Sequence, residues 1–96
     1  MQTIAIIKRG DDVVLQGVTV DINIHIKPSG IKSWDGDFST TFDTAFSIME
    51  VGETYTLVAS DGRSGSIIVE GVEIASSSET YVHFVGSGPF QIVRLD

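Results

Sequence analysis

Asp35, Asp37 and Ser39 are the side chains whose types and spacing come nearest to a metal site. Oxygen ligands at alternate positions open an EF-hand loop, and hard cations such as Ca²⁺ prefer oxygen. The EF-hand pattern then fails, because Thr40 stands where the loop needs glycine and Phe46 where it needs a bidentate glutamate. These three residues are therefore weak Ca²⁺ candidates, and a solvated acidic turn is the simpler interpretation.

Trp34, the single tryptophan, directly precedes this acidic stretch. An aromatic ring at the rim of a barrel can stack on a sugar or a peptide, and Asp35, Asp37 and Arg63 could add polar contacts. A single tryptophan more often closes a core with its indole N–H paired. We therefore expect Trp34 in the core, and keep as an alternative a carbohydrate or Ca²⁺ site in the loop of residues 34–37.

The remaining residue types offer little for catalysis or for a cofactor. The chain has no cysteine and two histidines, His25 and His83, whereas a zinc site needs three or four ligands. No serine lies in a G-x-S-x-G elbow. Asp35 with Asp37 would support glycoside hydrolysis only across a cleft, for which a chain this small has little room. We expect no cofactor and no enzymatic activity, and a small hydrolase is the last alternative.

Composition limits the classes of binding partner and the cellular compartment that we expect. The chain has 96 residues, 13 acidic and 6 basic, with a formal net charge of −7. Nucleic-acid binders carry a basic face and anionic membranes attract cations, so neither is an expected partner. The sequence shows no signal peptide and no apolar run long enough to span a membrane. Without cysteine, a reducing compartment is favoured, and we expect a cytoplasmic protein.

Residues 52–74 contain the pattern around which the rest is organised. Apolar and polar residues alternate on both sides of Asp61-Gly62, which is a strong hairpin signal. A one-residue slip would turn an apolar set to the wrong face. We therefore predict a three-residue loop, residues 61–63, with Leu57 opposite Ile67.

Two apolar alternations jump by three residues instead of two, at Gly17 and at Gly71. An extra residue at a glycine is what a β-bulge requires, so we predict a bulge at each, with a locally non-β backbone. The surrounding sequences match in type, VVLQGVTV against IIVEGVEI. This likeness predicts an internal repeat of residues 3–30 and 54–88.

The other strands are expected at residues 3–9, 13–20, 18–26, 80–85 and 90–95, with turns at 28–30, 35–36 and 86–89. Residues 38–49 fit both a strand and a helix, and their threonine and phenylalanine content favours the strand. The chain is thus predicted to be one all-β domain, residues 1–96. We expect a small closed or partly open antiparallel β-barrel of seven or eight short strands, with at most one short helix near residues 41–50. A β-sandwich is the alternative.

The predicted core consists of aliphatic and aromatic residues that share the inward parity of these strands. They are Ile6, Val20, Ile22, Ile24, Tyr55, Leu57, Ile67, Val69, Val72, Ile74 and Phe84. Hydrophobic residues make up 42% of a small chain, which leaves apolar surface available for association. We therefore expect a non-enzymatic interaction or structural module that binds protein and forms a homo-oligomer. The motifs assign the chain to no family.

Overall fold

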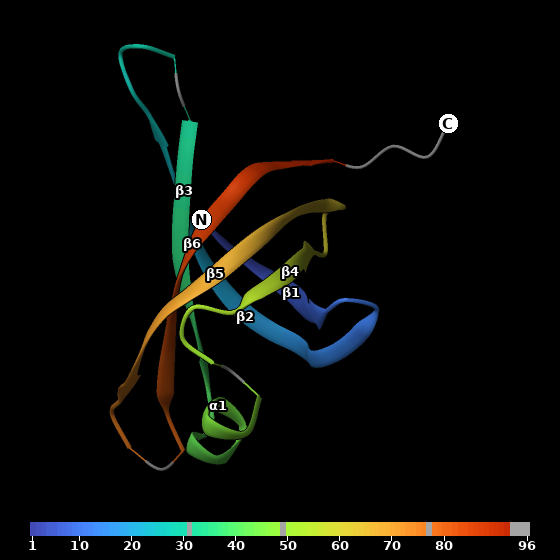
Figure 1. Ribbon diagram of the computed structural model, residues 1–96, viewed down its shortest axis with the longest axis vertical. Coiled ribbons are helices and arrows are strands. Elements are labelled where there is room, and N and C mark those ends of the chain that lie inside the picture. The colour runs from blue at the N-terminus through green and yellow to red at the C-terminus, as the bar shows by residue number, and fades with distance from the viewer. Residues whose placement is uncertain (31, 49, 77, 93–96) are drawn as a thin grey trace.

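The computed structural model describes residues 1–30, 32–48, 50–76 and 78–92 (Figure 1). In this part of the chain, six antiparallel strands form a closed barrel in the order β1-β2-β3-β6-β5-β4. The elements are β1 (Gln2–Arg9), β2 (Asp12–Ile26), β3 (Lys32–Thr40), α1 (Phe42–Ile48), β4 (Thr54–Ala59), β5 (Arg63–Ile74) and β6 (Thr80–Ile92). The predicted small antiparallel barrel is confirmed, and the alternative of a β-sandwich is wrong.

The strands are fewer and longer than predicted because two of them each join two predicted strands. β2 runs without interruption through residues 13–26, and β6 continues through the turn predicted at residues 86–89. The last part of the predicted strand 90–95 lies outside the described residues. The turn predicted at residues 35–36 is also wrong, since Gly36 lies inside β3. A Cβ at Gly36 would stand 2.2 Å from the carbonyl oxygen of Asp21, so this glycine permits close strand contact.

Both predicted bulges are present. Ala5 pairs with Val18 but Ile7 pairs with Leu15, so β2 carries an extra residue around Gly17, whose φ is 63°. β5 carries its extra residue between Val69 and Gly71. The predicted non-β backbone is confirmed at Gly17 by its positive φ, whereas Gly71 has no positive φ.

The β4–β5 hairpin uses a different loop from the predicted one. Tyr55 pairs with Ile67 and Leu57 with Gly65, so residues 60–62 form the loop instead of residues 61–63. Gly62 ends it with a φ of 94°, a conformation that glycine adopts without strain. The predicted pairing of Leu57 with Ile67 is off by two residues, which preserves parity and keeps Ile67 inside the barrel.

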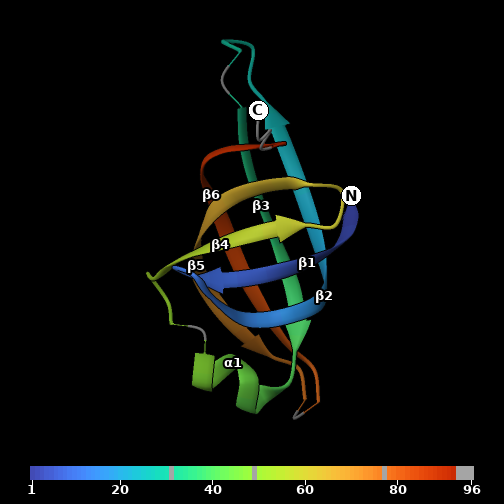
Figure 2. The same cartoon turned by 90° about the vertical axis from the view of Figure 1, so that its right-hand side faces the viewer.

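Of residues 38–49, for which composition favoured a strand, residues 38–40 belong to a strand but residues 42–48 do not, and Met49 lies outside the described residues. β3 ends at Thr40, and the short helix α1 follows, as in the alternative prediction near residues 41–50. Thr41 caps the helix, since its Oγ1 accepts a hydrogen bond from the amide of Thr44 at 3.3 Å. Ala45 faces the barrel and is buried, so α1 covers the lower end of the barrel in Figure 2. No helix among the described residues is long and apolar enough to cross a membrane.

The barrel interior forms one hydrophobic cluster. It contains the predicted core residues Val20, Ile22, Tyr55, Leu57, Ile67, Val69 and Phe84, and Val72 is partly buried against it. Ile6 is exposed because Ala5 and Ile7 take the inward positions of β1. Ile24 and Ile74 have the inward parity but are exposed, since they lie beyond the two ends of the barrel.

The strand order contains two three-strand meanders, β1-β2-β3 and β4-β5-β6. They join along the β1–β4 and β3–β6 pairs. The internal repeat of residues 3–30 and 54–88 stays a prediction, because this arrangement arises with or without duplication.

Leu57→Ala should destabilise the protein by roughly 2–5 kcal/mol, the range for truncating a buried large aliphatic side chain. Leu57 is fully buried, whereas Ile26 is 69% exposed. Ile26→Ala is therefore the control and should change the free energy of unfolding by less than about 0.5 kcal/mol. Urea denaturation measures both, and equal midpoints for the two variants would contradict the packing.

Gly17→Ala should cost about 1 kcal/mol or more, because its positive φ disfavours a Cβ. Gly71→Ala is the matched control, since Gly71 has ordinary φ and its Cβ would meet no atom within 4 Å. It should be neutral, or stabilising by up to about 1 kcal/mol. Thermal denaturation of both variants checks the difference, and equal losses would show that the two bulges are alike.

Candidate functional site

β2 and β3 continue past the barrel as a two-stranded arm, which is defined by residues 23–30 and 32–34. The pairing of β2 with β1 ends at Asp21, and the pairing of β3 with β6 begins at Asp35. Between these points the two strands pair only with each other in the described residues. Gly30, with a φ of 84°, lies in the turn predicted at residues 28–30. The arm projects from one end of the molecule, opposite α1 (Figure 1; Figure 2).

Trp34 anchors the base of the arm. Its indole is 5% exposed and its Nε1–H donates to the carbonyl oxygen of Gly88 at 2.9 Å. The indole stacks on Phe90 with ring centroids 4.7 Å apart and meets Phe84 edge-on at 6.0 Å. The predicted core position with a paired N–H is thereby confirmed.

Two glycines make room for this indole. A Cβ at Gly86 would lie 2.0 Å from Cε2 of Trp34, and a Cβ at Gly65 would lie 2.7 Å from Cζ2. Both distances are shorter than any real contact, so a larger residue at either position would displace the ring. Beyond Gly86, β6 pairs with β5 and no longer with β3.

An open groove of about 520 Å³ lies where the arm and β6 part. Its lining residues are Ile24, Lys32, Ser33, Trp34, Gly86, Gly88, Pro89, Phe90 and Gln91. Trp34 and Phe90 supply aromatic surface, while Ile24 is 47% exposed at the side of the arm. Lys32 is the one charged residue of this lining, which contains no carboxylate.

The strand alternation of β3 separates the acidic candidates from Trp34. Asp35 and Asp37 stand at positions that alternate with the buried ones, and Ser39 follows them as an exposed residue. Asp35 lies 2.9 Å from Nε2 of His25. The oxygen of Asp37 nearest to His83 is 3.9 Å from Nδ1. The structure thus places Trp34 and these residues on opposite faces of one strand instead of in one loop.

The two histidines lie among these outer carboxylates but form no metal site with them. Nε2 of His83 is 3.2 Å from a carboxylate oxygen of Glu73. No group of three or more potential ligands in the described residues has an arrangement that could hold a metal ion. The contacts of both histidines are ion pairs or hydrogen bonds between neighbouring strands.

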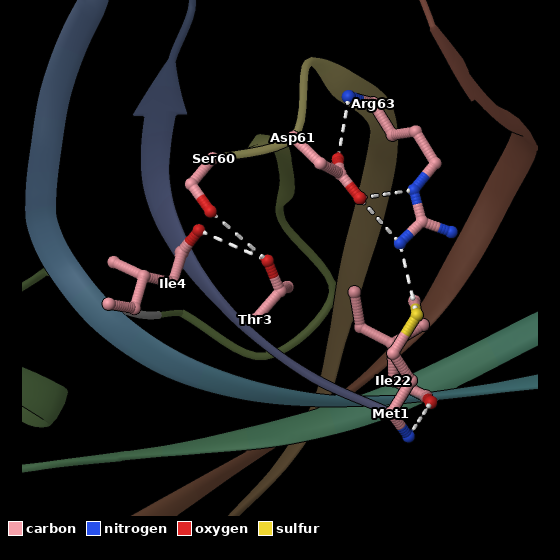
Figure 3. A network of polar contacts seen from close by, with 7 residues as sticks. All are labelled: Met1, Thr3, Ile4, Ile22, Ser60, Asp61 and Arg63. Atoms are coloured by element: carbon pink, nitrogen blue, oxygen red, sulfur yellow. Dashed lines mark hydrogen bonds and ion pairs between the residues drawn. The ribbon is translucent and has the colours of Figure 1, made fainter.

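Arg63, the remaining candidate, supports the wall of the groove. Its guanidinium lies 4.9 Å from the centroid of the Phe90 ring and 2.7 Å from a carboxylate oxygen of Asp61. The hydrogen bonds from Arg63 hold the pKa of Asp61 below its ordinary value. Figure 3 shows that Arg63 also reaches the sulfur of Met1, whose amino group donates to the carbonyl oxygen of Ile22 at 3.0 Å.

Two other pKa values shift, both away from the groove. A hydrogen bond to Glu79 raises the pKa of the Tyr81 hydroxyl, because the nearby carboxylate disfavours a phenolate. The hydroxyl of Tyr55 accepts a hydrogen bond from Arg9 at 2.9 Å, and this contact raises the pKa of the guanidinium. The Tyr81–Glu79 pair is exposed, whereas the Arg9–Tyr55 bond is partly buried because Tyr55 belongs to the core.

Sequence reasoning missed the exposed face of the arm. Ile24 was expected to face the core with the other residues of its alternation, and Ile26 has the same parity. The available signal was length, since an alternating run through residues 18–26 exceeds the five or six residues of an average strand. The residues beyond that average length form the part of β2 that projects from the barrel.

Comparisons with protein-family models, curated proteins and solved structures found no match for this chain. The fold and the site define a small closed antiparallel β-barrel that carries a projecting arm and a groove at the base of the arm. Because one fold can host many functions, the side chains of the arm and the groove, and not the barrel itself, indicate the function.

Gly86→Ala should displace the indole of Trp34 and destabilise the protein by about 1–3 kcal/mol, the cost of overpacking a core. Trp34 is the single tryptophan, so its fluorescence emission reports the change and should shift to longer wavelength as water reaches the ring. Gly71→Ala, at a position with open space, is the control. Unchanged emission and stability in Gly86→Ala would contradict this packing.

Proposed function

We propose that the chain is a non-enzymatic protein-interaction module whose binding surface is the arm with its groove. One observation carries the proposal: Ile24 and Ile26 are 47% and 69% exposed on a projecting arm beside an open groove, whose lining includes the partly buried ring of Phe90. Exposed apolar side chains next to a concave surface are typical of binding sites. The two strand stretches of the arm pair only with each other among the described residues, so each also keeps one edge without a strand partner.

The backbone of the arm supports the same function. Residues 32–34 pair with β2 on one side, and no described strand pairs with their other edge. A free strand edge can recruit an extended segment through main-chain hydrogen bonds, while nearby pockets select its side chains. The groove supplies such a pocket beside that edge.

Charge favours one kind of partner. Between Asp21 and Asp35 the chain carries Lys27 and Lys32 and no carboxylate. Charge complementarity steers association and suppresses wrong partners. The preferred partner segment therefore combines apolar with acidic side chains.

The alternative functions receive less support from the groove. Its volume suits a small ligand, but the buried indole of Trp34 leaves little ring surface for stacking a sugar. Asp35 and Asp37 belong to the other face of β3, so they add nothing to a ligand in the groove. The lining contains no carboxylate, cysteine or histidine to support a hydrolase.

The cysteine-free composition supports a cytoplasmic location, which stays a prediction.

Selection from a displayed library of random peptides tests the proposed surface. The wild-type chain should enrich peptides with apolar and acidic residues, and Ile24→Asp with Ile26→Asp should weaken their binding by about ten-fold or more. Ile4→Asp is the matched control, because Ile4 is exposed on β1 away from the arm. If the selected peptides bind the arm variant as well as the control, the arm is not the binding surface.

A further inference from the structure

We propose that the arm and groove of one copy bind the opposite end of a second copy, so that chains join head to tail. This inference rests on the proposed function and names its partner. The opposite end, named the acidic end, consists of α1, the last residues of β5 and Glu79. It presents Phe42, Phe46 and Ile74 together with Asp43, Glu73 and Glu79.

The acidic end exposes apolar side chains that a second copy would bury on binding. Phe42 and Phe46 are 37% and 59% exposed and stack with ring centroids 4.6 Å apart. Ile74, at the end of β5, is 53% exposed. Exposed aromatic and aliphatic side chains of this kind can pack against Ile24, Pro89 and Phe90 in the groove at the base of the arm.

The charges of the two ends are opposite. Asp43, Glu73 and Glu79 are exposed carboxylates, of which Glu73 also contacts His83 and Glu79 contacts Tyr81. The sequence has no lysine or arginine between Lys32 and Arg63, nor between Arg63 and Arg94. The arm carries Lys27 and Lys32 without any carboxylate. Contact between the ends therefore brings unlike charges together around a shared apolar centre.

The positions of the two ends determine the geometry of assembly. The arm and α1 lie at opposite ends of the longest axis, along which the molecule extends 40 Å (Figure 1). A contact between two different surfaces is heterologous, so it generates a ring or an open chain of copies instead of a two-fold dimer. An arm-to-arm dimer would bring the lysines of both copies together, which like-charge repulsion disfavours.

Paired charge reversals test this contact on the whole chain. The arm variant carries Lys27→Glu and Lys32→Glu, and the end variant carries Asp43→Lys and Glu73→Lys. Sedimentation velocity over a range of concentrations, at low salt, measures mass. The wild type should grow beyond a dimer, and each variant alone should associate about ten-fold or more weakly, because both of its ends now carry the same sign. Circular dichroism confirms that each variant folds.

An equal mixture of the two variants should recover assembly, since every arm then meets an end of opposite charge. Added salt should weaken both the wild-type assembly and the mixture. A wild type that stops at a dimer, an end variant that assembles like the wild type, or a mixture without recovery would each overturn head-to-tail assembly. A wild type that stays monomeric also overturns it, and selected peptides that still require Ile24 and Ile26 would then leave the proposed function standing.

Discussion

The burial of the Trp34 indole is the interaction on which the open end of the barrel depends. β3 and β6 part at this point, because β6 turns to pair with β5 alone beyond Gly86. The indole fills the space between them. Its hydrogen bond to the carbonyl oxygen of Gly88 connects β3 with β6 at a point where the two strands share no backbone hydrogen bonds. Phe90 then covers the ring, and Arg63 covers Phe90. The groove exists because a side chain, and not a strand, closes this end.

The arm itself follows from the length of β2. Its 15 residues pair with β1 along one edge as far as Asp21 and with β3 along the other edge from Val20 to Ile26, so the last residues of β2 extend past the start of β1. The extra residue around Gly17 lies within the part paired with β1, where a bulge increases the local twist. β5 also carries an extra residue, next to Gly71, which has no positive φ. A left-handed glycine is thus one means of forming a bulge, and the parity of the sequence indicates the bulge more reliably than the glycine conformation does.

Sequence periodicity predicted which face of a strand is apolar but not where the barrel ends. Leu57, Ile67 and both bulges follow from parity alone, because a displaced period would expose a whole apolar set. Ile24 obeys the same parity and is still exposed, since burial at that position depends on whether another strand lies across from it. The threonine and phenylalanine content of residues 38–49 favoured a strand, but residues 42–48 form a helix whose first turn is capped by Thr41. The candidate site was found in part, through Trp34. Its grouping with Asp35 and Asp37 fails because neighbouring strand residues face opposite sides.

Charge distribution explains why association would use the arm. A chain with a net charge of −7 repels its own copies at long range, and side-by-side contact through the outer face would bring Asp35, Asp37 and Glu73 against their equivalents. The arm reverses the local sign with Lys27 and Lys32 and pairs this charge with exposed isoleucines. It is thus a part of the described surface where an acidic partner would gain both electrostatic attraction and apolar burial. The acidic end of another copy meets both requirements. The proposed head-to-tail assembly therefore uses the uneven distribution of charge over a chain that is acidic as a whole.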